Sequence, residues 1–158
     1  MILVTVGMQM PFDRLCKAVD EWAGKNGRED VFMQIGVTDW RPSHVDFTTK
    51  IAPSDFNNQI SQAQLLVIHA GIGSIVSAIE CGKPILVMPR QMKLRETRND
   101  HQIATAKRIK GLDGIAVAMD EHELVDKLND INLSATREPL ATSASPDLLN
   151  KIRTFIHE

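Results

Sequence analysis

The stretch LLVIHAGIGSIV, residues 65–76, decides the fold class of this protein. Its first part, Leu65–His69, is a short apolar run with the length and composition of a strand that is buried on both faces. Glycines follow at once at positions 71 and 73, and apolar residues then recur at helical spacing as far as Gly82, a residue suited to a helix C-terminus. A buried strand that turns directly into a helix is the repeating unit of a parallel α/β sheet.

The same alternation continues on both sides of this stretch. Six runs have the character of strands: Ile2–Val6, Val31–Ile35, Val45–Ile51, Leu65–His69, Pro84–Met88 and Ile115–Ala118. Helical periodicity lies between most of them: 12–22, Asp55–Ala63 with Ser54 as its cap, 71–82, Asn99–Lys110, and Glu121–Asn129 with Asp120 as its cap. The pattern predicts an α/β fold, a Rossmann-like, doubly wound and mostly parallel sheet.

The chain has room for one domain and a tail. Its 158 residues fall within the usual size of a single domain. We expect residues 1–130 to form that domain and residues 131–146, which are polar, to be a linker. Residues 147–158 then form an amphipathic helix, opened by Ser145 and Pro146. Its apolar face either covers the core of the domain itself or docks onto a partner chain.

Composition excludes several classes of protein. With 43% hydrophobic and 24% charged residues, the chain is an ordinary folded protein, and its net charge of −2 and 4% aromatics give no general basis for binding nucleic acid. The two cysteines lie in apolar, helix-like stretches and are expected to be reduced. The N-terminal residues look like a strand and not a signal peptide, and no apolar run approaches the about 20 residues that span a bilayer. We therefore expect a cytoplasmic protein.

Charge is uneven along the chain. Residues 90–110 carry seven Lys or Arg and two acidic residues, whereas residues 111–130 carry six acidic residues and one Lys. The basic block is either a solvated face or an anion site, and its position directly after a strand end favours the second.

Four candidate loops follow the carboxyl ends of predicted strands, where open α/β sheets bind their ligands. They are Gly7–Phe12, Gln34–Gly36, Gly71–Ser74 and Asn99–Gln102. Glycine permits close approach of backbone to a ligand, and a helix start offers unpaired N–H groups to a phosphate. The Asn99–Gln102 run offers directional donors and acceptors for sugar hydroxyls, or it is simply a polar first helical turn. Together they indicate a phosphate-bearing, hydroxyl-rich small molecule.

The sequence does not match the known motifs for dinucleotide, P-loop nucleotide or zinc binding, or for a nucleophile elbow. A dinucleotide G-x-G-x-x-G would need glycine where Val76 stands, and a P-loop would need a hydroxyl where Pro84 follows Gly82-Lys83. His101 and Gln102 have no second His or Cys at zinc-ligand spacing. His69 is accompanied by no nucleophile elbow or paired carboxylate, which favours a packed residue over a catalytic one.

The order of these motifs resembles the C-terminal, donor-binding half of the family 28 glycosyltransferases. The motifs that carry the resemblance are Val6-Gly7…Phe12–Leu15, Gln34–Gly36, His69-Ala70-Gly71-x-Gly73-Ser74, Gly82–Pro84, Pro89-Arg90 and Arg98–Gln102. The match looks closest to stand-alone small subunits, including those of bacterial exopolysaccharide synthesis. It implies one half of a GT-B enzyme that binds a UDP-sugar and transfers the sugar with inversion of configuration at the anomeric carbon. It also implies that no metal or other cofactor is bound.

The resemblance also assigns residues. His69 is the tentative catalytic residue, and the residues implied in nucleotide-sugar binding are Gly7, Gln9, His69, Gly71, Gly73, Ser74, Ser77, Asn99, Asp100 and Gln102. Many relatives carry a ribose-binding Glu where this chain has Ser77, so Ser77 makes that contact, Glu80 replaces it, or ribose is held differently. Met8, where Thr is common, is a milder departure.

The resemblance further implies partners. A membrane-anchored subunit would bind a lipid-linked acceptor and recruit this chain to the cytoplasmic face of the membrane. The basic block 90–110 and the last helix are the surfaces expected to meet that subunit or the membrane. The alternative is a regulatory or scaffolding subunit that retains the fold, and a nucleotide-sugar epimerase is disfavoured because one half-domain lacks an opposing wall.

Overall fold

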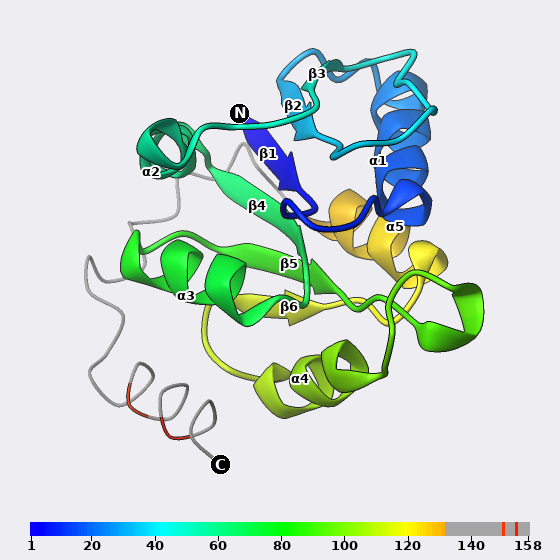
Figure 1. The fold of residues 1–158 in the computed structure, drawn as a ribbon. Coiled ribbons are helices and arrows are strands. Elements are labelled where there is room, and N and C mark those ends of the chain that lie inside the picture. Colours follow the sequence, from blue (N-terminus) through cyan, green and yellow to red (C-terminus); the bar gives the residue numbers. More distant parts are fainter. Residues whose placement is uncertain (132–149, 151–153, 155–158) are drawn as a thin grey trace.

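The structure, a computed structural model, describes residues 1–131 together with Asn150 and Thr154. Strands and helices alternate along most of the chain, as Figure 1 shows. The strands are β1 Ile2–Thr5, β2 Val31–Gln34, β3 Asp46–Thr48, β4 Leu65–His69, β5 Ile85–Met88 and β6 Ile115–Val117. The helices are α1 Asp13–Lys25, α2 Pro53–Gln62, α3 Ile72–Glu80, the short 3₁₀ helix η1 Met92–Leu94, α4 His101–Ile109 and α5 Glu121–Asp130.

All six strands form one sheet in the order β3-β2-β1-β4-β5-β6, and every neighbouring pair is parallel. In the centre, Ile2 of β1 lies opposite both Val31 of β2 and Leu65 of β4. The strand order reverses direction between β1 and β4. The doubly wound, parallel α/β fold expected from the sequence is confirmed.

The central strands are apolar on both faces because each face has its own core. In β4, Leu65 and Val67 belong to one hydrophobic cluster, and Leu66 and Ile68 belong to the other. This period of two follows from the alternation of side chains along a strand. A strand with helices on both faces therefore needs a continuous apolar run, as residues 65–68 provide.

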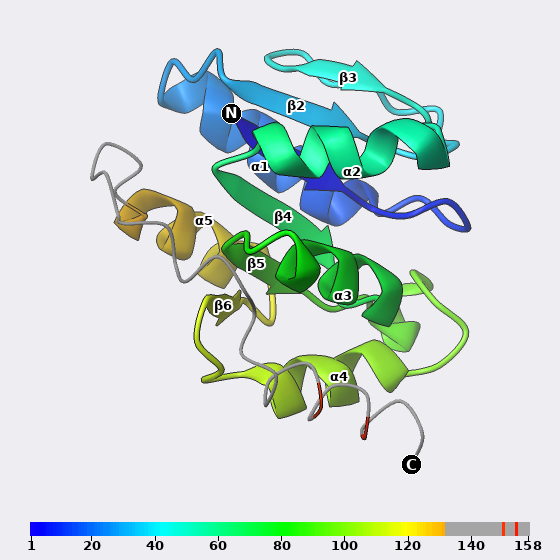
Figure 2. The same cartoon turned by 90° about the vertical axis from the view of Figure 1, so that its left-hand side faces the viewer.

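The helices divide between the two faces of the sheet. Apolar residues of α1 and α5, such as Leu15 and Leu124, pack in the first cluster, while Ile60 of α2, Ile75 of α3 and Ala106 of α4 pack in the second. Figures 1 and 2 show α1 and α5 on one side and α2, α3 and α4 on the other. The sequence between β2 and β3 contains no helix, and Trp40 and Val45 from that loop cover the α1 face.

Several predicted boundaries needed correction. The cap expected at Ser54 is wrong, because α2 begins at Pro53, two residues earlier than expected, with Ala52 at the N-cap. The helix expected from Asn99 begins at His101. The strand expected over residues 45–51 is only Asp46–Thr48, at the exposed edge of the sheet. In contrast, Asp120 caps α5, with its carboxylate accepting from the backbone N–H groups of the residues two and three positions on.

The predicted linker 131–146 and the helix 147–158 lie outside the described residues, apart from Ile131, Asn150 and Thr154, so the proposed domain boundaries stay predictions. Cys16 and Cys81 are free thiols, and burial raises the pKa of Cys16 to about 12. Within the described part of the chain, no helix is long and apolar enough to cross a membrane.

Candidate functional site

The topology places the candidate loops at one edge of the sheet. All strands are parallel, so their carboxyl ends lie on the same side. The order reverses between β1 and β4, and ligands of open α/β sheets bind outside such a switch point. The loops that leave β1 at Gly7 and β4 at Ala70 therefore flank the expected binding position.

His69 ends β4 between two glycines at this switch point. An added Cβ would lie 3.0 Å from Cε1 of His69 at Gly7 and only 2.2 Å from its Nε2 at Gly71. Gly7 also has a φ of +76°, which L side chains rarely adopt. Both glycines thus make room for the imidazole. The sequence predicted that Gly71 lets the backbone come close to a ligand. In the structure, the ring of His69 occupies the space next to Gly71 instead.

The imidazole of His69 is neutral in this setting. Burial, and to a smaller extent the positive charge of Arg90, lower the pKa of His69 to about 4, against a smaller opposing contribution from the Thr5 backbone. The Nδ1 atom is buried and has no hydrogen-bond partner in the structure. At neutral pH His69 is therefore available as a hydrogen-bonding group and not as a cation.

The first turn of α3 is open where the sequence predicted a phosphate contact. Around Gly73 an added Cβ would meet nothing within 4 Å, and the residue is exposed. The first intrahelical bond in α3 joins Ile75 N to Gly71 O at 3.1 Å, so the preceding amides, including that of Ser74, come before the helical ladder. Ser77 lies one turn beyond Gly73 on the same face of the helix, and Glu80 follows on that face.

Gln34 joins three strand ends and does not face a ligand. Its Oε1 accepts from Thr5 Oγ1 at 2.8 Å and from Val6 N at 3.2 Å. Its Nε2 donates to Gly7 O at 3.0 Å and to Thr49 O at 3.1 Å. The side chain is only 2% exposed. The Gln34–Gly36 motif therefore fixes the carboxyl ends of β1, β2 and β3.

Arg90 is the buried cation of this edge. It is 5% exposed and lies two residues after the end of β5, and its Nη2 donates to Val6 O at 2.7 Å and to Met10 O. Its guanidinium lies over the ring of Phe12, 5.2 Å from the centroid. Its Nε is buried without a partner, and no ion pair to Arg90 occurs among the described residues.

The start of α4 reaches the same edge through Gln102. Its Oε1 accepts from Arg90 N at 3.1 Å, which links α4 to the end of β5. Asp100 Oδ1 accepts from Met92 N at 2.9 Å, and Asn99 Oδ1 accepts from His101 N at 3.1 Å. Asn99 and Asp100 are exposed and Gln102 is half-buried. Each of these side chains orders the loop before α4.

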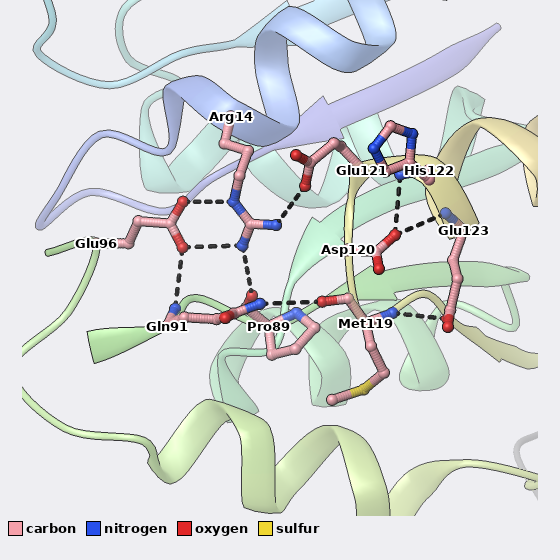
Figure 3. A network of polar contacts seen from close by, with 9 residues as sticks. All are labelled: Arg14, Pro89, Gln91, Glu96, Met119, Asp120, Glu121, His122 and Glu123. Atoms are coloured by element: carbon pink, nitrogen blue, oxygen red, sulfur yellow. Dashed lines mark hydrogen bonds and ion pairs between the residues drawn. The ribbon is translucent and has the colours of Figure 1, made fainter. Parts of the chain in front are cut away.

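A second arginine braces that loop from α1, as Figure 3 shows. Arg14 forms a bidentate pair with Glu96, Nε to Oε1 at 2.7 Å and Nη2 to Oε2 at 2.9 Å. Its Nη1 contacts Glu121 of α5 at 2.8 Å, and Glu96 Oε2 also accepts from Gln91 N at 2.9 Å. Burial opposes the charge on Arg14, but the two carboxylates raise its pKa.

The structure thus brings together Gly7, His69 and Gly71 directly, and connects Gln102 to the Gly7 loop through Arg90. Gln9 is exposed in that same loop. Gly73, Ser74 and Ser77 lie on α3, which follows β4, the strand next to β1 in the sheet. Sequence reasoning did not single out Arg90 as a site residue. The available signal was a basic residue placed two positions after a strand end.

The described residues offer no metal site: no group of three or more His, Cys, Asp or Glu side chains lies close enough together in that part of the chain. The expected absence of a resident metal or cofactor stays a prediction.

Comparison with known families decides the classification. The model for the "Glycosyltransferase family 28 C-terminal domain" matches residues 1–158, the whole chain. The chain belongs to this family. The resemblance stated from the sequence motifs is confirmed, and the family domain is present over the same residues that form the sheet and its covering helices. A search of curated proteins finds no significant match.

Solved structures share the fold of this family 28 domain. The solution structure of ALG13 aligns with a TM-score of 0.66 at 16% identity, covering 99% of this chain and 96% of that one. The glycotransferase of kitacinnamycin aligns at 0.58 and 20% identity, covering 98% of this chain but 38% of that one. The calicheamicin glycosyltransferase CalG4 aligns at 0.59 and 16% identity, covering 99% and 43%. This chain therefore spans less than half of those two glycosyltransferases and nearly all of ALG13.

Proposed function

We propose that this chain is the donor-binding and catalytic subunit of an inverting UDP-sugar glycosyltransferase in exopolysaccharide or lipid-linked glycan synthesis. It works with a membrane-associated subunit that binds the lipid-linked acceptor and recruits it to the cytoplasmic face of the membrane. The observation that carries the proposal is the family 28 match over the whole chain. The likeness in fold to ALG13 over nearly the full length of both chains supports a stand-alone subunit.

The chemistry divides between two surfaces. An acceptor hydroxyl oxygen would form the new bond to the anomeric carbon while the bond from that carbon to the diphosphate oxygen breaks, and UDP leaves with the electron pair. Catalysis on this chain would consist mainly of stabilising the negative charge on the departing diphosphate. The described residues present amides, glycines and a neutral histidine at the edge, and the base that takes the acceptor proton would come from the partner.

The proposed residue roles are those that the family resemblance implies, and the positions of several residues support them. The open first turn of α3, with Gly73 and Ser74, is suited to the diphosphate. Gly7 and Gln9 would approach it from the β1 loop, and neutral His69 would donate a hydrogen bond to the diphosphate or the sugar. The sugar hydroxyls would be bound by Asn99, Asp100 and Gln102, and the ribose by Ser77 or Glu80.

Calorimetric titration of the full chain with UDP and several UDP-sugars tests the donor site. We expect the same UDP affinity with magnesium as with EDTA, because the site needs no resident metal. Replacement of Gly73 by Leu fills the space in front of the α3 amides and should abolish UDP binding while the fold is retained. No binding of any nucleotide with the partner present would overturn the proposal.

One observation favours a second candidate, a regulatory or scaffolding subunit. The family resemblance implies a ribose-binding Glu at the position of Ser77 in many members, whereas Ser77 is a half-buried serine on α3. A transfer assay with the partner separates the two candidates. Sugar transfer lost on Gly73→Leu supports the enzyme, whereas transfer that continues without UDP binding to this chain supports the scaffold.

A further inference from the structure

The proposed function assigns no role to Arg90, yet this residue contacts several segments at the carboxyl edge of the sheet. Its Nη2 donates to carbonyls at both sides of the β1 loop, Val6 O and Met10 O. Its backbone N–H is held by Gln102 of α4, and its side chain stacks on Phe12. One residue thereby connects the loop after β1, the loop after β5 and the start of α4.

The positive charge of the Arg90 guanidinium is not neutralised by a carboxylate among the described residues. No ion pair to Arg90 occurs in the part of the chain that the structure describes, and burial lowers its pKa although Glu96 opposes this at longer range. A buried charge without a paired ion is expensive unless it is hydrogen-bonded or has a further partner. Arg90 satisfies part of that demand with backbone carbonyls, and its Nε remains without a partner.

Another stacked arginine, Arg28, provides a contrast. Arg28 lies over Trp22 at 5.7 Å from the centroid, in the same kind of contact, but it pairs with Asp30 at 2.7 Å. Asp30 directly precedes β2, so this pair sits at the amino edge of the sheet, opposite the proposed site. Arg28 therefore shows the same stacking contact with its charge paired and at a distance from the ligand edge, which makes it a matched control for Arg90.

We infer that Arg90 is a positioning residue for the diphosphate: it fixes residues 7–10 of the β1 loop in the binding conformation and adds a buried positive charge beneath the diphosphate position. It acts through the loop, since its donors to Val6 and Met10 point into the protein and it is 5% exposed. This inference rests on the proposed function for its ligand, but the effect on the loop does not.

The test compares Arg90→Lys and Arg90→Met with the matched variant Arg28→Met, using the full chain. Amide hydrogen exchange is measured at residues 7–10, and Kd is measured for UDP and for UMP. We expect Arg90→Met to speed exchange at residues 7–10 and to weaken UDP binding about tenfold or more, with a smaller loss for UMP. Arg90→Lys keeps the charge and should recover part of the UDP affinity, whereas Arg28→Met should change neither quantity.

Each outcome is decisive. Unchanged exchange at residues 7–10 in a folded Arg90→Met protein overturns the inference, as does a UDP affinity of that variant equal to that of the unsubstituted chain. Equal losses for UDP and UMP also overturn the link to the diphosphate. If Arg90→Met fails to fold, Arg90→Lys decides the question by the same two measurements. If the unsubstituted chain binds no nucleotide, the proposed function fails, and faster exchange confined to residues 7–10 still supports the role in the loop.

Discussion

Gly71 and Gly73 stand two positions apart, yet their surroundings differ completely. At Gly71 a Cβ would collide with the imidazole of His69, whereas at Gly73 it would meet open space. The first glycine is needed for packing inside the protein, and the second leaves the α3 amides accessible. Side-chain geometry, and not the glycine pattern, separates the two roles.

Alanine at each position should therefore have opposite effects. We expect Gly71→Ala to destabilise the protein by about 1–3 kcal/mol, because the rigid backbone and buried ring leave no room for a methyl group. Gly73→Ala should leave stability unchanged or raise it by up to about 1 kcal/mol, since alanine favours the helix. Urea unfolding of both variants checks this, and equal losses would contradict the assigned packing.

His69 predicts a pH dependence of stability. Its pKa in the folded protein is about 4, below the ordinary value of 6.5, so the unfolded chain takes up the proton first as the pH falls. The contribution is complete above pH 6.5 and is lost between pH 6.5 and 4, to a total of about 3 kcal/mol. Urea unfolding at several pH values should show a shallower slope for His69→Gln than for the unsubstituted chain. Parallel curves for the two proteins would argue against a neutral, buried His69.

At the level of elements, α2 and α5 begin in different ways although each has a capping residue near its start. Asp120 accepts from His122 N at 3.0 Å and from Glu123 N at 2.9 Å. Ser54 makes no cap bond because α2 has already begun at Pro53, and its hydroxyl lies 3.4 Å from Asp55 Oδ1 instead. A proline in the first turn has no N–H to satisfy, which removes part of the need for a cap.

Replacement of each residue by alanine measures this difference. We expect Asp120→Ala to lower the free energy of unfolding by about 1 kcal/mol, the usual value of an N-cap. The matched variant Ser54→Ala should change it by less than about 0.5 kcal/mol, as surface substitutions do. Chemical denaturation with a common m-value provides both numbers, and a larger loss at Ser54 would contradict the observed helix start.

Over the whole molecule, Arg14 holds together segments that lie far apart in the sequence. From α1 it contacts Glu96 in the loop after β5 and Glu121 at the start of α5. The Glu96 pair is the more sheltered, with side chains 16% and 12% exposed, whereas Glu121 is 41% exposed. Screening by water therefore makes the Glu121 contact the weaker of the two.

Glu96→Gln should lower the free energy of unfolding by about 1–3 kcal/mol, because it leaves a partly buried guanidinium without its bidentate partner. Glu121→Gln should cost less than about 1 kcal/mol. A double-mutant cycle with Arg14→Met checks both pairs, and we expect the larger coupling energy for Glu96. Equal coupling energies would show that exposure does not govern this network.

Local sequence patterns determined the fold class, the order of most elements and the edge of the sheet that carries the loops. Apolar runs such as Leu65–His69 report burial on both faces, and parallel strands place all their carboxyl ends together. Motif order also identified the family, which the match over residues 1–158 confirms. These properties depend on neighbours in sequence, so the sequence is sufficient for them.

Only the tertiary structure decided which residues at that edge make contacts within the protein and not with a ligand. The Gln34 amide donates to backbone carbonyls at two other strand ends, and the ring of His69 occupies the space next to Gly71. The Arg90 guanidinium donates to carbonyls 84 and 80 residues away in the chain. The contacts of Gln34 and Arg90 join segments whose distance in sequence carries no information about their distance in space. The buried position of Arg90 and the open position of Gly73 therefore became visible only when the sheet had brought the loops together.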